Sequence, residues 1–209
     1  MHFYDYHDIV PCLDTIVLPY VDAIIEEVAH VATTWQPWPE KSLIKLGDTN
    51  AWTVLPLLHT LPSNDVANSV WVQEFVSALP ITTAVLRSVP NIRTALISRM
   101  KPLTLLAPHS GYADMANHVL RVHVPLTLPP PDDDGRPCTG VVVEGAVQYH
   151  QKNTPLVFDD SRVHYAFNKH RETERTVLLF DVARPAHVAP GSSTVVATKE
   201  LLDLMDYFN

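Results

Sequence analysis

The sequence predicts a mainly β protein with helices in its N-terminal half, in which the strands form a double-sheet jelly roll. Short apolar runs rich in β-branched residues follow one another in the second half of the 209-residue chain. Turn-forming residues separate these runs, among them Pro129-Pro130-Pro131 and Asp134-Gly135. Several short strands at regular spacing favour an antiparallel sandwich or barrel, and a jelly roll can hold a ligand inside its sheets.

The first half of the chain is predicted to be largely helical. A run over residues 70–86 has helical character and is interrupted by Pro80. The apolar stretch over residues 51–58 contains Pro56 and stays ambiguous between helix and strand. The clearest helix follows Pro19, at a position where a helix tolerates proline. Its apolar residues at helical spacing are Val21, Ile24, Ile25, Val28 and Val31.

The strands are expected in the second half of the chain. Residues 129–137 are polar and rich in proline, which indicates an exposed loop between strands. The strand candidates cover residues 103–106, 119–128, 141–147, 156–158 and 176–182. We therefore expect one domain over residues 1–209. Residues 1–95 or so form a largely helical support, about 96–185 form the β core, and 186–209 form a C-terminal tail with a short helix.

Composition and charge narrow the classes of partner and compartment. Apolar residues make up 46% of the chain and charged residues 18%, which is enough for a core. The formal net charge of -8 disfavours nucleic acid, and no basic cluster or long apolar run points to a membrane. The N-terminus has no basic start, and Cys12 and Cys138 stand apart, as free thiols would. A cytoplasmic protein without an obligate protein partner is expected.

Two of the 11 histidines stand where a metal site could form. His109 and His164 each lie at the edge of a β-rich run, and Arg175 opens the apolar strand that follows His164. A metal held by two histidines keeps open positions for other ligands. A buried Arg suits an anion because its guanidinium pairs bidentately with a carboxylate. This order alone is weak, because a chain with 11 histidines supplies it often by chance.

Several local segments resemble the aspartyl/asparaginyl β-hydroxylase family, in family order and at near-family spacing. The most specific is Phe-Asp-Asp-Ser-x-x-His followed by Arg and a Phe-Asp-Val strand. The resemblance covers about residues 47–185. Its segments are Ser98-Arg99-Met100-Lys101-Pro102, Pro108-His109-Ser110-Gly111, Leu120-Arg121-Val122-His123, Phe158-Asp159-Asp160-Ser161 with His164, and Arg175 with Phe180-Asp181-Val182.

The resemblance implies a double-stranded β-helix of the cupin-like kind that uses non-haem Fe(II), 2-oxoglutarate as co-substrate and O2. His109 and His164 match the two iron ligands of the family. Ser98 and Arg175 match the pair that binds the distal carboxylate of 2-oxoglutarate. His109, His164 and Arg175 are thus the residues expected to carry catalysis.

Four further residues are expected around the co-substrate. Arg121 and His123 match the pair near the metal-bound carboxylate, and they share one face of a strand. A buried Arg needs an anion, which a 2-oxoglutarate carboxylate would provide. Met100 and Trp52 are expected to line the cavity. For His123, a satisfied core histidine is the alternative.

The segment after His109 is where this chain departs from the family. Gly111 stands where most 2-oxoglutarate oxygenases have an acidic ligand, and the family resembled also has Gly there. The segment from His109 to Arg121 is a few residues longer than in the family, with the extra residues near Tyr112 and Asp114. We therefore expect a bulge at the rim of the substrate pocket. Asp114 contacting the metal is an alternative.

Some charged residues around the predicted site have an alternative interpretation, in which they support the structure and do not bind a ligand. Arg175 could pair at the surface with Asp181 or Glu174 instead of binding a co-substrate. Asp160, like Asp159, is expected to shape the turn before His164.

The expected function is hydroxylation of an unidentified substrate, with release of succinate and CO2. The substrate would be a small molecule, as in natural-product tailoring, or an Asp or Asn residue in a peptide. Desaturation, epoxidation and ring formation stay open as outcomes. The rival functions are a non-haem iron halogenase, with halide in the vacant carboxylate position, and a non-enzymatic cupin-like binding module.

Overall fold

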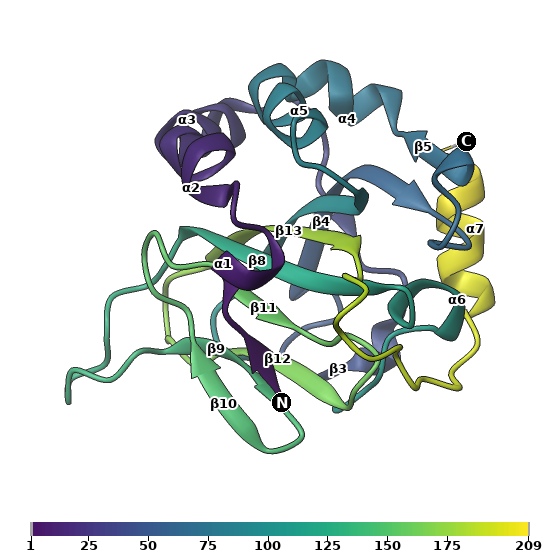
Figure 1. Ribbon diagram of the computed structural model, residues 1–209. Helices are drawn as coiled ribbons and strands as arrows, with labels where there is room; N and C mark the ends of the chain where they lie inside the picture. Colours follow the sequence, from purple (N-terminus) through teal and green to yellow (C-terminus); the bar gives the residue numbers. More distant parts are fainter. Residues whose placement is uncertain (1, 209) are drawn as a thin grey trace.

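Two antiparallel β-sheets lie over one another in the computed structural model, which describes residues 2–208 (Figure 1). The larger sheet has eight strands. In spatial order its main path is β1 (Phe3–Tyr4), β11 (Leu156–Phe158), β8 (Val119–Thr127), β13 (Arg175–Ala183), β6 (Ile92–Met100), β4 (Trp52–Thr60) and β2 (Gln36–Pro37), and β5 (Ser69–Trp71) pairs with β4.

The smaller sheet completes the jelly roll. Its five strands run β10 (Ala146–Tyr149), β9 (Thr139–Val143), β12 (His164–Asn168), β7 (Thr104–Leu106) and β3 (Ile44–Leu46). Apolar side chains from both sheets meet between them, for example Val54 and Leu179 of the larger sheet with Val141 and Leu106 of the smaller one. The double-stranded β-helix predicted from the sequence is confirmed.

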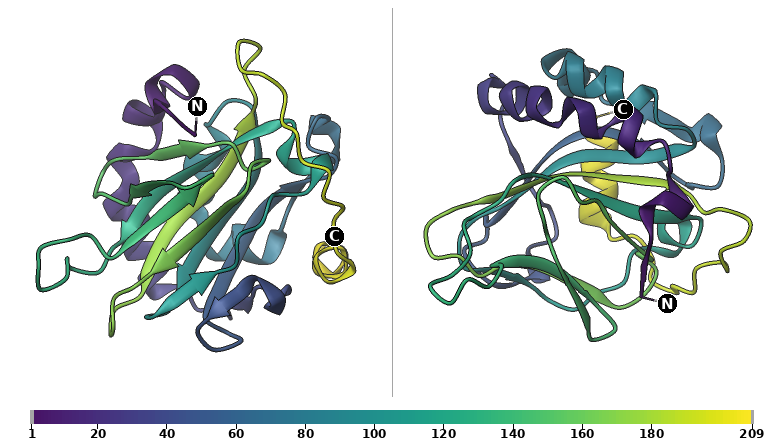
Figure 2. Two further views of the ribbon diagram at one scale, coloured as in Figure 1. Left: turned by 90° about the horizontal axis from the view of Figure 1, so that it is seen from below. Right: turned by 60° about the vertical axis from the view of Figure 1, so that its left-hand side comes forward.

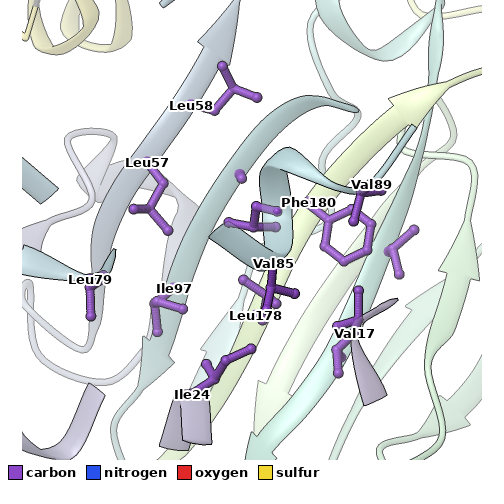
Figure 3. Packing of buried hydrophobic residues seen from close by; sticks show 14 of the residues in the cluster. Val17, Ile24, Leu57, Leu58, Leu79, Val85, Val89, Ile97, Leu178 and Phe180 are labelled. Carbon is purple, nitrogen blue, oxygen red and sulfur yellow. The ribbon is translucent and has the colours of Figure 1, made fainter. Parts of the chain in front are cut away.

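Helices cover the outer face of the larger sheet (Figures 1 and 2). Short 3-10 helices η1 (Leu18–Tyr20), η2 (Lys41–Leu43) and η3 (Val66–Asn68) connect elements. The α-helices are α1 (Tyr6–Ile9), α2 (Leu13–Ile16), α3 (Val21–His30), α4 (Gln73–Ala78), α5 (Pro80–Arg87), α6 (Ala113–Ala116) and α7 (Lys199–Tyr207). The helix expected after Pro19 is α3, and its Ile24 packs with Val85 of α5 against the sheet (Figure 3).

Strand β13 shows how one sheet serves two cores. Its residues alternate between faces, as the two-residue period of a strand requires. Leu178 and Phe180 belong to the core beneath the helices, which Figure 3 shows, whereas Val177 and Leu179 belong to the core between the sheets. Both faces of this strand are therefore apolar, which explains its continuous run of apolar residues.

The expected division of the chain is wrong at its first boundary. Residues 1–95 are not only a helical support, because the ambiguous stretch over residues 51–58 lies almost wholly in β4, which pairs with β6 near one edge of the larger sheet. Pro56 is tolerated there because the pairing of β4 with β6 shifts register between Pro56 and Leu58. The run over residues 70–86 holds the end of β5 and most of α4 and α5, and Pro80 starts α5.

Two further segments refine the predicted strands. The run over residues 141–147 is a hairpin, because Glu144 and Gly145 both adopt positive φ (47° and 85°) and reverse the chain between β9 and β10. Residues 129–137 form the expected loop between β8 and β9. Within residues 2–208, no helix has the length and apolar character needed to cross a membrane.

Candidate functional site

The backbone brings His109 and His164 together as an isolated β-bridge. The amide of His109 donates to the carbonyl of His164 (3.0 Å), and the reverse bond measures 2.8 Å. This pairing places the two imidazole rings side by side, with their centroids 4.4 Å apart. His164 is the first residue of β12, so the smaller sheet positions it directly. The two residues predicted as iron ligands are therefore adjacent.

Hydrogen bonds fix the orientation of both rings. Nδ1 of His109 lies 2.8 Å from the carbonyl oxygen of Ala107, and Nδ1 of His164 lies 2.8 Å from that of Arg162. A carbonyl can only accept, so each Nδ1 carries the proton and each Nε2 keeps its lone pair. Burial and the neighbouring His109 hold the pKa of His164 well below its usual range, so this ring is neutral at pH 7.

The donor chemistry of this pair fits Fe(II). Neutral imidazole nitrogens bind first-row divalent metals, and a backbone carbonyl on the other ring nitrogen is the usual support for such a ligand. Across residues 2–208, no group of three or more His, Cys, Asp or Glu side chains is arranged to hold an ion. The two histidines would therefore leave several metal positions open for other ligands.

Asp160 lies closer to the site than the sequence predicted. Its Oδ1 is 3.2 Å from Nε2 of His164. A Cβ added to Gly111 would lie 2.0 Å from Oδ2 of Asp160, so this carboxylate fills the space beside Gly111. Asp160 was expected only to shape the turn before His164, but its carboxylate also lies beside the histidine. Asp159 does shape that turn, because it accepts a hydrogen bond from the amide of Ser161 (3.1 Å). The available signal was the short separation in sequence, because Asp160 precedes His164 by only four residues in a tight loop.

Two aspartates already provide the counter-ions of Arg121. Its Nε and Nη2 donate to the two carboxylate oxygens of Asp181 (2.8 and 2.9 Å), and its Nη1 donates to Asp160. Arg121 and Asp181 face each other across β8 and β13. The expectation that a co-substrate carboxylate supplies the anion for Arg121 is thus unnecessary, although Arg121 does line the cavity.

Arg175 has the opposite environment. Its side chain is 1% exposed, and its Nε has no hydrogen-bond partner within residues 2–208. Its Nη1 makes one long bond, 3.4 Å, to the hydroxyl of Ser98. Burial lowers the pKa of Arg175 to about 9, because no anion offsets the loss of water around the charge. The alternative surface pairs do not form, since Asp181 binds Arg121 and Glu174 lies beside Arg99 (3.6 Å).

A small cavity of about 30 Å³ joins this cation to the histidine pair. Trp52 closes one side, and its indole N–H donates to the hydroxyl of Ser98 (3.0 Å). The predicted site residues that line this cavity are Trp52, Ser98, Met100, His109, Arg121, His123, His164 and Arg175. An unpaired buried cation at one end and two imidazoles at the other can together hold a ligand with an anionic group at its far end.

His123 has support that the sequence did not reveal. Its Nδ1 lies 3.3 Å from Nε2 of His150, and Nδ1 of His150 lies 3.3 Å from the hydroxyl of Thr139. Two proton arrangements satisfy these contacts, one in which Thr139 donates to His150 and His150 to His123, and the reverse. In the first arrangement, His123 carries its proton on Nε2 and can donate it to an anion in the cavity. The core-histidine alternative and the site role are compatible, because His123 is buried and lines the cavity.

The segment after His109 forms a helical turn. The expected bulge is wrong, because residues after Tyr112 wind into α6. Tyr112 lines a second, larger cavity beside the histidines and donates its hydroxyl proton to Glu40. Asp114 is exposed on α6 and does not line this cavity, where Met115 lies instead. The structure therefore brings Tyr112 to the site and leaves Asp114 outside it.

We expect Gly111→Ala to destabilise the protein by about 1–3 kcal/mol, as an overpacked site does. The added methyl group would overlap Asp160 and lie 2.7 Å from Cβ of Ala116, so the carboxylate must move. Urea denaturation measures the change, with Ser110→Ala as the control at a neighbouring loop position. Unchanged stability would mean that Asp160 has free space into which it can shift.

Comparisons with known proteins show which family the chain belongs to. The family model described as Aspartyl/Asparaginyl beta-hydroxylase matches residues 20–185. The ornithine lipid ester-linked acyl 2-hydroxylase of Rhizobium tropici is 33% identical over 113 residues, which are 54% of this chain and 37% of that protein. The chain thus matches little more than a third of that relative's length.

Solved structures of similar fold have low sequence identity to the chain. A prolyl-4-hydroxylase from Pseudomonas putida has a TM-score of 0.49 at 12% identity, covering 85% of this chain and 98% of that one. A 2OG-Fe(II) oxygenase family protein from Burkholderia pseudomallei has a TM-score of 0.49 at 16% identity, covering 85% and 82%. Because the family model spans most of the chain, including both histidines and Arg175, the chain belongs to the aspartyl/asparaginyl beta-hydroxylase family, as its local segments predicted.

Proposed function

We propose that the protein is an Fe(II)- and 2-oxoglutarate-dependent dioxygenase that hydroxylates its substrate and releases succinate and CO2. The observation that carries this proposal is Arg175. A buried cation without an anion is costly, and it lies in the same small cavity as His109 and His164. A dicarboxylate that reaches both the metal and this guanidinium would remove that cost.

Each residue has a distinct task in this proposal. His109 and His164 would hold Fe(II) through their Nε2 atoms. Arg175 and the Ser98 hydroxyl would bind the distal carboxylate of 2-oxoglutarate, and His123 would donate to its other carboxylate. Bound Fe(II) supplies the activation of O2, with 2-oxoglutarate as the source of two electrons. The apolar walls exclude water from the reacting atoms.

The position of Asp160 favours hydroxylation over halogenation. The halogenase alternative needs a vacant anion position next to Gly111. The carboxylate of Asp160 occupies that space and would repel a halide there. The alternative of a non-enzymatic binding module gives no reason for a buried, unpaired Arg175, so it is also less well supported.

The substrate is a separate question. A small molecule, as in natural-product tailoring, and an Asp or Asn residue of a peptide are the two classes that the sequence leads us to consider. The name of the Rhizobium tropici relative, an acyl 2-hydroxylase of a lipid, adds a fatty-acyl chain as a third class.

The test of the proposed function does not require the substrate. The purified chain is supplied with Fe(II), 2-oxoglutarate and air, and succinate is measured by mass spectrometry, with a chelator-treated sample as control. Calorimetry of 2-oxoglutarate binding to the metal-loaded chain is the second readout. We expect metal-dependent succinate formation and saturable binding. If the metal-loaded chain does not bind 2-oxoglutarate, the proposal is wrong.

We further expect Tyr112 to control coupling, meaning the amount of product formed per succinate. Tyr112→Ala should lower coupling and leave metal content and the KM for 2-oxoglutarate near normal, because Tyr112 lines only the larger cavity. Asp114→Ala is the matched control in the same segment and should change none of these quantities. Loss of iron in Asp114→Ala would instead make Asp114 a third ligand and refute the two-histidine account.

A further inference from the structure

A second cavity of about 370 Å³ extends from the metal site toward the C-terminal helix. It begins at His109 and Asp160, and its walls come from β4, β6, β13 and α7. Most of the side chains on these walls are aliphatic, such as Leu58, Leu96 and Leu179. A ligand in this space would therefore make mainly apolar contacts, and one end of it would lie beside the histidines.

Helix α7 closes the far end of the cavity. Figure 1 and Figure 2 show it beside β4, at the edge of the larger sheet. The ring of Phe208 packs edge-on against Phe75 of α4, with centroids 5.4 Å apart. The acidic residues Glu200, Asp203 and Asp206 are exposed on the other side of the helix. The residues that face the cavity are Leu201, Leu204, Met205 and Phe208, at the spacing of one helix face.

A buried carboxylate holds the N-terminus of α7 in place. Glu40 is 6% exposed and accepts hydrogen bonds from the hydroxyl of Thr198 (2.9 Å), from Tyr112 and from the indole of Trp38 (3.2 Å). Thr198 is also the N-cap of α7, because its hydroxyl accepts from the amide of Leu201 (3.3 Å). The helix is thus attached to the segment that follows His109, and the polar atoms of Glu40 are satisfied within the protein.

The charges on the cavity wall do not suit an acidic substrate. Arg121 is the only Lys or Arg among the described residues that line the cavity, and its guanidinium is taken up by Asp181 and Asp160. Burial lowers the pKa of His59, so this histidine adds no positive charge at pH 7. A substrate carboxylate would instead meet Asp160 and Glu40. A peptide would also bury backbone groups against walls that offer few hydrogen-bond partners.

We propose that this cavity binds the aliphatic chain of a fatty-acyl group, with the carbon to be oxidised beside His109 and His164 and the methyl end under α7. This substrate class rests on the proposed function above. In the reaction, one C–H bond of the chain becomes C–OH with one oxygen atom of O2. The other oxygen atom enters succinate as 2-oxoglutarate loses CO2, so atoms and electrons balance.

Binding and turnover are tested separately. Binding to the metal-free chain uses the methyl ester of a fluorescent polyene fatty acid, displaced by saturated esters from octanoyl to stearoyl. Turnover with Fe(II) and 2-oxoglutarate uses the same acyl series as free fatty acids and as ester-linked lipids in micelles, with Asp- and Asn-containing peptides as a third arm. Hydroxylated products are identified by mass spectrometry. We expect product from the ester-linked lipid arm and little from the free-acid arm, because a free carboxylate would meet Asp160 and Glu40.

Leu204→Trp tests where the methyl end lies, because it would shorten the cavity beneath α7. We expect kcat/KM for stearoyl substrates to fall by at least about tenfold relative to octanoyl substrates, since one methylene in an apolar pocket changes discrimination by about 10- to 200-fold. Leu202→Trp is the control on the same helix, where Leu202 is 37% exposed and does not line the cavity. It should leave the chain-length profile unchanged.

Each outcome distinguishes the two proposals. Both proposals are supported if hydroxylated acyl product forms and if the chain-length preference moves to shorter acyl chains in Leu204→Trp but not in Leu202→Trp. Acyl binding that Leu204→Trp weakens for long chains, without any succinate formation, supports the cavity assignment and refutes the dioxygenase. Succinate formation with a hydroxylated peptide, or with no acyl binding or product, refutes the acyl chain and leaves the dioxygenase standing. An unchanged profile in Leu204→Trp places the methyl end elsewhere and overturns the proposal.

Discussion

His109→Ala and His164→Ala are each expected to abolish turnover and to reduce the bound iron to a small fraction of the wild-type content. The reason is that, under the proposed function, two imidazoles hold the metal, and the described residues offer no third side chain arranged to replace one of them. Removing either ring leaves a single protein ligand. Iron content is measured by atomic emission on folded, gel-filtered protein, and turnover by succinate and product formation.

The control is His118→Ala, which removes an exposed histidine beyond α6. It should keep its iron and its activity. Circular dichroism confirms that each variant is folded, which matters because His109 and His164 also bridge two strands through their backbones. Alanine leaves those backbone bonds intact, so a folded protein is expected. Full iron occupancy in either site variant would show that the metal lies elsewhere.

Arg175→Ala is expected to raise the KM for 2-oxoglutarate by about 30- to 900-fold, which corresponds to roughly 2–4 kcal/mol for a lost buried ion pair. Arg175→Lys should cost less, because it keeps the charge and loses the bidentate geometry. The readout is succinate formation as a function of 2-oxoglutarate concentration. Arg171→Ala, at an exposed position in the loop before β13, is the control.

The stability of the free protein separates a binding role from a structural one. Arg175 is buried without an anion, so its removal should not destabilise the unliganded protein much. In the wild type, 2-oxoglutarate should raise the Tm of the metal-loaded chain, because the ligand binds only the folded state. Arg175→Ala should lose that increase. An unchanged KM would mean that another cation anchors the co-substrate.

Local patterns were enough to predict many of the elements and to single out the two histidines that the fold brings together. The helical period before residue 32 predicted α3, and apolar β-branched runs predicted β8, β11 and β13. Specific segments around His109, His164 and Arg175 identified the family. These signals are local, because the period of a helix or strand and the residues of a motif can be read from a short segment without knowledge of distant residues.

The sequence could not predict which charges neutralise each other. Arg121 and Arg175 look alike as basic residues at strand positions, yet Arg121 is bound by Asp181 and Asp160 and Arg175 is left without an anion. The register between β8 and β13 decides this, because it places Arg121 opposite Asp181. Register is a property of paired strands and not of either strand alone.

By itself, the sequence determined the mainly β class, the family and the pair of histidines. The tertiary structure alone decided that β4 lies within the sheet despite Pro56, that Asp160 fills the space beside Gly111, and that Thr198 meets Glu40. The last contact joins residues 158 positions apart. Such contacts form only when the whole chain has folded, because the free energy that holds them comes from burying distant segments against one another, which no local pattern records.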